Sequence, residues 1–528
     1  MPLLGRNRML KRYRTLMLLT VLALTGCVKD RLALAPSAPE QPWVIPHRSA
    51  KPPQPTAVPS ATSNPGHTES PSLSPSAKAA DYGMAEFPET HWDKGAATKG
   101  NVVGIDRARH YDLAALIDLA QRNNPETREA WERARQAALG VGLVESTYLP
   151  QISAEIISGF QTTPLAIPKY LNPNGYFTTD TRELIPSLVA KWLLFDFGRR
   201  EGIEAAARAN SFVANVSFTG VHQKIIYAVS REYFALGAAR ARLLVAEQAL
   251  KTAKIVQDAS EMRRANGLAT VVELAQANQQ TAKAQFNLER AKGAEHAAYA
   301  ALIASMGIPP KTALEVADSS DLALPTEPSG SIDQLFQDAL ANRPDIIAAL
   351  GKIKAAEATL KSADASYYPT VSLMAQAYEN LGGFSTNGGP FYSVNRPGAN
   401  ILLKLEWPLF DGGARDTRVA SARSEIAAAE MALDQTKVAA AQQVTDAYDS
   451  LQTGFAEYTA AKVLTEASQT AYDAALDTYR YGVGTYTDVA NAENALTQAQ
   501  SEKVTAHANI FTAAAALAFA TGAILSQP

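Results

Sequence analysis

The chain has 528 residues, of which 47% are hydrophobic and 19% are charged, and its formal net charge at pH 7 is −3. This length suffices for a sizeable core, and the near-neutral charge implies no basic surface of the kind that nucleic-acid binding requires. The single cysteine excludes an intrachain disulfide. The sequence contains no nucleophile elbow, phosphate-binding loop, metal-ligand spacing or paired catalytic carboxylates, so we expect no enzyme, no metal and no cofactor.

The N-terminus has the pattern of an export signal. Basic residues between Arg6 and Arg14 precede the apolar run Leu16 to Leu24, and the run Leu24-Thr25-Gly26-Cys27 follows. This ending resembles a bacterial lipoprotein signal, so we expect residues 1–26 to be removed and Cys27 to carry a covalent lipid. Val28 stands where an inner-membrane retention signal has aspartate, which indicates the outer membrane. The alternative is an ordinary signal peptide in which Cys27 is incidental.

Residues 27–104 have a different composition from the rest of the chain. They are rich in Pro, Ser, Ala and Thr, and closely spaced prolines prevent both helices and sheet ladders. We therefore expect a disordered, semi-extended tether between the lipid and a folded body. The body begins at about residue 105, and residues 526–528 form a short tail.

The folded body contains a long internal duplication. The stretch Trp192–Gly198, W-L-L-F-D-F-G, recurs as Trp407–Gly413, W-P-L-F-D-G-G, at an offset of 215 residues. Upstream, Pro150 pairs with Pro369 at an offset of 219, so the register changes once, in a loop. The sequence predicts two structural repeats, residues 105–328 and 329–525.

Each repeat contains two segments with the alternation of a β-strand, at about 151–163 and 184–195 and again at about 370–381 and 399–410. One face of each is apolar and the other is more polar, and aromatic residues stand near one end. This is the signature of a membrane β-barrel, although a half-buried sheet in a soluble domain has the same period. Four strands cannot close a membrane barrel, and an open edge is excluded in lipid. If the strands lie in a membrane, several chains must share one barrel.

Long helices follow each strand pair. No proline occurs from Gly198 to about Arg263, and a helix of about 65 residues is roughly 100 Å long. Leu236, Leu243 and Leu250 recur every seven residues, each with an alanine three positions later, which is the pattern of a coiled-coil seam. Glycine-containing turns then lead into returning helices. Each repeat is therefore predicted as helix, two strands, long helix, tight turn and returning helix, an α+β fold.

These motifs together resemble the TolC-type outer-membrane factor family. They are the Asn124-Pro125 and Arg343-Pro344 openings, the Tyr-x-Pro entries to the strands, the Phe-Asp-x-Gly exits and the Gly482–Val489 turn, all in duplicated order. The lipoprotein signal suggests the lipoprotein branch, which serves multidrug efflux. The resemblance implies a homotrimer with four strands per chain in a shared twelve-stranded barrel, continued by a long α-helical periplasmic barrel. It also implies a periplasmic adaptor protein and an inner-membrane transporter as partners.

The resemblance further implies a periplasmic gate and an adaptor-facing tip. The positions that match the gate are Asp488, Asn491, Tyr479, Arg480 and, in the first repeat, Glu273. Members of the family have a second acidic residue where this chain has Asn491, so we expect one acidic ring at the constriction instead of two. The tips that face the adaptor are expected at Gly267 and Leu268 and at Gly482, Val483, Gly484 and Thr485.

Three functions remain open at this point. The first is a passive trimeric duct that exports small molecules in a tripartite efflux system. The same duct serves type I protein secretion, which is the second. The third is a lipid-anchored periplasmic coiled-coil scaffold that conducts nothing. The aromatic residues Trp192, Trp407, Phe195 and Phe410 at the strand ends favour a membrane duct, because such residues gather at membrane interfaces.

Overall fold

The computed structural model describes residues 31–44, 105, 109–319, 322–326 and 331–525. The predicted signal peptide, Cys27, most of the predicted tether and the tail lie outside the described residues. The chain divides into two units, and the larger one comprises the residues up to Trp43 together with those from Asp106 onward. Of the second unit, Val44–Ile105, only the two end residues are described.

The larger unit contains the duplicated order of elements that the sequence predicts. The first repeat runs through α2 (Leu113–Asn123), α3 (Pro125–Ser146), β2 (Gln151–Ala166), β3 (Tyr176–Phe195), α4 (Arg199–Ala265) and α5 (Val271–Ser305). The second repeat runs through α6 (Ile332–Asn342), α7 (Pro344–Asp364), β5 (Thr370–Asn380), β8 (Arg396–Glu406), α8 (Ala414–Arg480) and α9 (Tyr486–Ala520). The short elements are η2 (Arg31–Leu34), β1 (His110–Tyr111), β4 (Glu315–Val316), η4 (Ala365–Tyr367), β6 (Gly383–Thr386), β7 (Tyr392–Ser393) and η5 (Ala523–Leu525).

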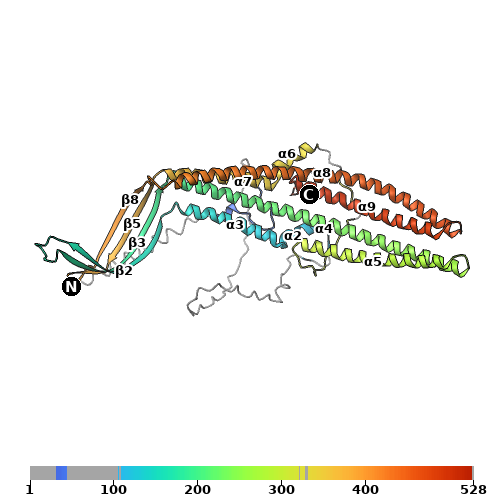
Figure 1. The fold of residues 1–528 in the computed structure, drawn as a ribbon, viewed down its shortest axis with the longest axis horizontal. Helices are drawn as coiled ribbons and strands as arrows, with labels where there is room; N and C mark the ends of the chain where they lie inside the picture. The colour runs from blue at the N-terminus through green and yellow to red at the C-terminus, as the bar shows by residue number, and fades with distance from the viewer. Residues whose placement is uncertain (1–30, 45–104, 106–108, 320–321, 327–330, 526–528) are drawn as a thin grey trace, which may run out of the picture. The chain divides into compact units, whose positions relative to one another are not determined.

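The four long strands form one antiparallel sheet in the order β2-β3-β5-β8 (Figure 1). Gln151 lies opposite Lys191 in the first pair, and Thr370 lies opposite Glu406 in the last. Beyond the end of β5, strand β3 pairs with β6, and β6 pairs with β7. In the described part of the chain, β2 and β8 each have a strand on one side only. They are therefore the open edges of the sheet.

The strands differ in length from the sequence prediction. β3 begins at Tyr176 instead of at about residue 184, because its outer half is paired with β2 and β6. β8 ends at Glu406, four residues before the predicted end. Pro408 follows directly after Trp407 and lacks the N–H that a ladder needs, whereas Leu193 at the equivalent position lets β3 continue to Phe195. The β6–β7 hairpin was not predicted.

The long helices confirm the predicted seam. α4 and α8 each have 67 residues, which corresponds to about 100 Å. Leu250 and Ala253 of α4 are buried against Ala284 and Leu288 of α5, with Leu243 packed beside them. The α4–α5 and α8–α9 hairpins lie side by side (Figure 1). Among the described residues, none of the helices combines the length and the apolar character needed to cross a bilayer.

The Asn-Pro and Arg-Pro openings tie each short helix to the end of a returning helix. Asn124 caps α3 and donates its amide to the carbonyl of Ser305 at the end of α5 (3.1 Å). Arg343, at the equivalent place, donates to the carbonyl of Ala520 at the end of α9 (3.0 Å). Gly522 follows α9 with a φ of +76°, and a Cβ there would lie 2.8 Å from the backbone of Asn342. Glycine is therefore required both for the turn and for the contact.

The duplicated Phe-Asp-x-Gly motif forms the junction between sheet and helix. In the first repeat, Arg200 forms a 2.9 Å ion pair with Asp196 and donates to the carbonyls of Thr147 and Leu193, and its guanidinium lies over the ring of Tyr148. In the second repeat, Arg415 pairs with Asp411 and donates to the carbonyls of Pro408 and Leu409. The motif thus satisfies the carbonyls that the strand leaves unpaired where the helix begins.

Residues 31–43, here called the strap, depart from the expectation of a disordered tether. Asn215 of α4 donates to the carbonyl of Leu34 (2.6 Å), and Trp131 of α3 donates to that of Pro36 (3.0 Å). Trp43 packs edge-on against Phe212 at a centroid distance of 5.7 Å, and its carbonyl accepts from Thr219. The strap is therefore held on α3 and α4 by hydrogen bonds to its backbone and by one aromatic contact.

Candidate functional site

The candidate site is built on the two hairpin turns. Gly267 and Gly482 follow the long helices with φ values of +72° and +82°, a conformation that favours glycine. Gly484 serves a different purpose, because a Cβ there would lie 2.6 Å from the hydroxyl oxygen of Thr478. Leu268 and Val483, which follow the first two glycines, are 69% and 81% exposed. Each turn therefore presents an apolar side chain to solvent.

The acidic residues predicted for the gate cap helices. Thr270 and Glu273 form a capping box at the start of α5, and Thr485 and Asp488 form the equivalent box at the start of α9. The carboxylate of Asp488 accepts from the hydroxyl and the amide of Thr485, and these bonds lower its pKa. Both carboxylates lie in the first turn of a helix, where the helix dipole also favours a negative charge.

Tyr479 joins the two hairpins just before the second turn. It is 1% exposed, and its hydroxyl is 2.9 Å from that of Ser260 on α4. The guanidinium of Arg263 lies over its ring at 4.5 Å and also donates to its carbonyl. Ser260, Arg263 and Tyr479 are here called the tip lock. The lock connects α4 to α8 through a hydrogen bond, a cation–π contact and a backbone contact.

Further contacts between the hairpins lie next to the tip lock. The Tyr486 hydroxyl donates to the carbonyl of Gln276 on α5 (3.1 Å), and the amide of Gln280 donates to Asn494 (3.1 Å). Glu493 of α9 is only 4% exposed, and this burial raises its pKa to about 7. Burial and the nearby Glu493 carboxyl raise the pKa of Tyr486 to about 12. Two neutral hydrogen bonds thus supplement the tip lock, and a buried carboxyl group lies near them.

The other predicted gate residues lie outside the tip lock. Arg480 is exposed and forms only a 3.7 Å ion pair with Asp477 on its own helix. Asn491 is exposed on α9. Of the predicted gate residues, Tyr479 alone contacts the opposite hairpin in the described contacts, while Glu273 and Asp488 cap helices. In the described ranges, no three His, Cys, Asp or Glu side chains gather as a metal site requires.

Comparison with known proteins identifies the family. The family model described as outer membrane efflux protein matches residues 116–308 and 335–523. The chain belongs to the outer membrane efflux protein family. It is 28% identical to protein CyaE of Bordetella pertussis over 417 residues, which cover 79% of this chain and 85% of that protein. It is 25% identical to the cation efflux system protein CusC of Escherichia coli over 394 residues, which cover 73% and 80%.

The fold of this outer membrane efflux protein is that of TolC-like channels. The crystal structure of the outer membrane protein VceC from Vibrio cholerae superposes with a TM-score of 0.62 at 23% identity, covering 78% of this chain and 96% of that one. The predicted α+β architecture and the predicted family are therefore confirmed. As a member of this family, the chain is an outer-membrane efflux protein.

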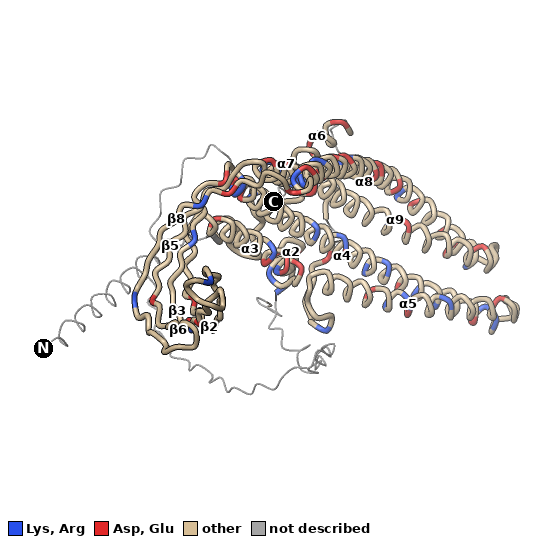
Figure 2. Tube along the Cα trace, turned by 60° about the vertical axis from the view of Figure 1, so that its left-hand side comes forward, with Lys and Arg blue, Asp and Glu red and all other residues tan. Residues whose placement is uncertain are grey.

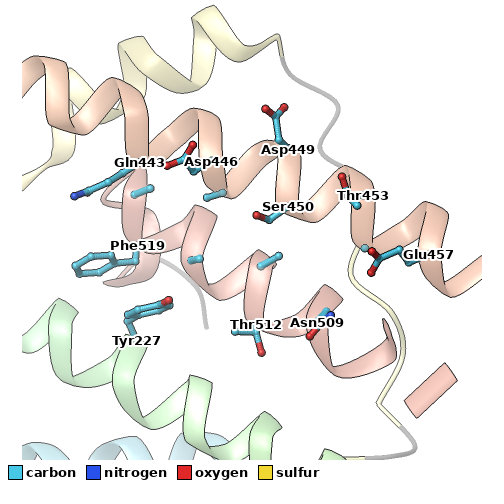
Figure 3. Close-up of a pocket in the computed structure, with 15 residues that line it drawn as sticks. Tyr227, Gln443, Asp446, Asp449, Ser450, Thr453, Glu457, Asn509, Thr512 and Phe519 are labelled. Carbon is cyan, nitrogen blue, oxygen red and sulfur yellow. The ribbon is translucent and has the colours of Figure 1, made fainter. Parts of the chain in front are cut away.

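The efflux protein also has an acidic cavity of about 920 Å³ between α4, α8 and α9 (Figure 3). Tyr227 and Phe519 stack at one end of it, with their ring centroids 5.0 Å apart. Asp446, Asp449 and Glu457 of α8 line the cavity, and its described lining contains no Lys or Arg. Elsewhere charged residues of both signs are spread along the long helices, whereas the strands carry few (Figure 2).

Sequence reasoning missed several residues that join the hairpins. Ser260, Arg263 and Gln276 have no motif of their own, and their partners are more than 200 positions away. Glu493 did carry a signal. It stands in the apolar series Tyr486, Val489, Glu493 and Leu496, all buried, whose spacing of three or four residues marks one helix face. A carboxylate at such a core position points to a perturbed group.

Proposed function

We propose that the chain is the outer-membrane channel of a tripartite efflux system, a passive trimeric duct for small molecules. The observation that carries this proposal is the open sheet, whose edge strands β2 and β8 each have a partner on one side only among the described residues. Unpaired backbone groups are not tolerated in lipid. Three copies that pair β8 of one with β2 of the next close a barrel of twelve long strands, within the range of membrane barrels.

The exposed side chains of the edge strands support a membrane location. Ile152, Ile156 and Phe160 alternate along one face of β2, and Ile401, Leu403 and Leu405 alternate along one face of β8, all exposed. Trp192 and Trp407 lie at the junction end of the sheet and donate to the carbonyls of Tyr148 and Tyr367. Amphipathic aromatic residues at the end of an apolar strand face fit the boundary between lipid and water.

The strap supports a lipid anchor on Cys27. Leu34 is bonded to Asn215, which lies 16 residues after the start of α4 at Arg199, about 24 Å along the helix. From Leu34 back to Arg31 the chain is the 3-10 helix η2, which spans about 6 Å, and the four residues from Arg31 to Cys27 add at most about 14 Å. A lipid on Cys27 can therefore cover most of the distance to the junction, the level at which the aromatic residues indicate the membrane surface.

The hairpin tips are the proposed contact with a periplasmic adaptor, which an inner-membrane transporter supplies with energy. Their support is the exposed apolar pair Leu268 and Val483, at equivalent places in the two repeats. The tip lock, close to these turns, is the proposed gate, because separating the hairpins requires its contacts to break. Asp488, Asn491 and Arg480 remain predicted contributors to the charge at the closed end.

The deciding experiment combines assembly and conduction. Protein extracted from outer membranes is measured by light scattering and then inserted into planar bilayers. We expect a trimer that resists dissociation on an unboiled gel and forms channels. A monomer without channel activity would refute the duct and favour the scaffold. In the native host, deletion of the gene should raise the accumulation of small toxic compounds. If the deletion abolishes only the secretion of a protein, type I secretion is the function instead.

A further inference from the structure

A second cavity, of about 410 Å³, lies between the two hairpins and has no role in the proposed duct. It is lined by α4, α8 and α9 and by Ser319, which precedes α6. We call it the inter-hairpin pocket. Its volume lies within the range of small-molecule sites. It is lined by residues of both hairpins, so an occupant would touch both.

Aromatic rings form the walls of the inter-hairpin pocket. Phe234 of α4 stacks against Phe511 of α9 with centroids 4.9 Å apart. The ring of His507 meets Phe511 edge-on with centroids 5.1 Å apart, and the ring centroid of Tyr458 of α8 lies 5.6 Å from that of His507. Ala241, Ala508 and Val504 complete the apolar surface. A flat or slender apolar body would be enclosed by these walls.

The polar groups of the pocket lie on one face of α9. Gln500, Lys503 and His507 are spaced by three and four residues, which places them in a row along the helix. Within the described part of the chain, no hydrogen bond or ion pair involves any of these three side chains. Burial and the charge of Lys503 lower the pKa of His507. The described lining includes no Asp or Glu, so the ammonium group of Lys503 has no counter-ion there.

Gly237 allows a fourth segment, the one that carries Ser319, to line the pocket beside α4, α8 and α9. A Cβ at Gly237 would lie only 1.8 Å from the hydroxyl oxygen of Ser319. The glycine therefore allows the segment that carries Ser319 to lie against α4, where Ser319 is buried. This adds a hydroxyl group to the wall of a pocket whose other polar groups come from α9.

We propose that the inter-hairpin pocket binds a small amphipathic carboxylate with an aromatic body. The ring of the ligand packs between the aromatic walls, and the ammonium group of Lys503 and the side-chain amide N–H of Gln500 donate to its carboxylate. Lys503 is a half-buried residue without an ion-pair partner among the described residues, and it favours an anion, because a charge-assisted hydrogen bond to a carboxylate is stronger than a neutral one. Binding at this site does not depend on conduction, so the proposed site and the proposed duct are tested independently of each other.

The test uses the full-length protein in lipid nanodiscs and fluorine NMR of 4-(trifluoromethyl)benzoate. We expect line broadening that titrates to saturation, while the neutral amide of the same ring binds at least about tenfold more weakly. Lys503→Met should weaken benzoate binding about tenfold, and Lys503→Arg should retain it. Ala508→Phe should abolish binding by filling the pocket. Lys254→Met, which removes an exposed lysine of α4 nine residues beyond the lining residue Val245, is the matched control and should leave binding unchanged.

Three results would overturn the proposal. They are the absence of broadening in the wild type at millimolar benzoate, equal binding of benzoate and benzamide, and equal losses of benzoate binding in Lys503→Met and Lys254→Met. Because Ala508→Phe adds volume to a packed region and can prevent folding, its thermal midpoint is measured first. If that variant does not fold, the comparison of Lys503→Met with Lys254→Met and Lys503→Arg decides alone.

Discussion

At the scale of single residues, the hydroxyl group of Tyr479 supplies one of the three contacts of the tip lock. Tyr479→Phe removes the hydrogen bond to Ser260 and leaves the ring under Arg263. We expect the loss of about 1 kcal/mol of stabilisation between the hairpins, and hence an open state about fivefold more populated if the lock holds the gate. Single-channel recordings measure this as a longer open time.

The matched control for this substitution is Tyr481→Phe, because Tyr481 is 85% exposed at the same turn. Its recordings should match the wild type. Unchanged recordings in Tyr479→Phe would place the gate elsewhere than at the tip lock.

Glu493 makes the contact between the hairpins sensitive to pH. Its pKa rises from the usual 4.5 to about 7 in the folded chain, so between these values the folded state binds more protons than the unfolded state. Stability therefore falls as the pH rises through this window, by up to about 3 kcal/mol. Glu493→Gln keeps the group neutral, and its thermal midpoint should fall less than that of the wild type between pH 5 and pH 8.

Other carboxyl groups also titrate, so the informative quantity is the difference between variants. Glu502→Gln, nine residues further along α9 at an exposed position, is the control and should follow the wild-type curve. If Glu493→Gln also follows that curve, the carboxyl group of Glu493 is solvated in the folded protein, contrary to its burial.

At the scale of elements, the two junctions are equivalent in sequence and unequal in burial. The side chains of Arg200 and Asp196 are 9% and 7% exposed, whereas those of Arg415 and Asp411 are 12% and 25% exposed. Removing one partner of a buried pair leaves an uncompensated charge and costs about 3 to 5 kcal/mol. Arg200→Ala should therefore lower the thermal midpoint of the refolded chain more than Arg415→Ala does. Equal losses would show that the second junction is as buried as the first.

The duplication explains why so many elements could be predicted from the sequence. The long helices, their glycine turns and the capping boxes depend on local patterns such as Thr270 with Glu273, and each pattern occurs twice. The docking of the strap could not be predicted, because side chains of α3 and α4 donate to its backbone carbonyls. Every residue has such a carbonyl, so the sequence of the strap does not mark these contacts. The partners of Tyr479 escaped because contacts between hairpins depend on register over more than 200 residues, which periodicity does not fix.

At the scale of the whole molecule, the open sheet has a geometric consequence. Gln151 begins β2 and Glu406 ends β8 at the same end of the sheet, since each lies opposite a residue next to the junction. When β8 of one copy pairs with β2 of the next, the two strands run antiparallel, and Ser153 lies near residues 402–404 of the neighbour. Partners directly opposite in such a pair have Cβ atoms about 5 Å apart, close to the range that a disulfide bridges.

We therefore predict disulfides between copies of the chain. Ser153→Cys is combined in turn with Leu402→Cys, Leu403→Cys and Lys404→Cys, and the oxidised membranes are run on a non-reducing gel. At least one combination should give covalent trimers without larger products, because a ring of three closes on itself. The combination of Ser153→Cys with Tyr481→Cys should remain monomeric, because one cysteine lies in the sheet and the other at the hairpin tip. Monomers in every combination would exclude β2–β8 pairing, while a ladder of larger products would indicate an open chain of copies in place of a closed barrel.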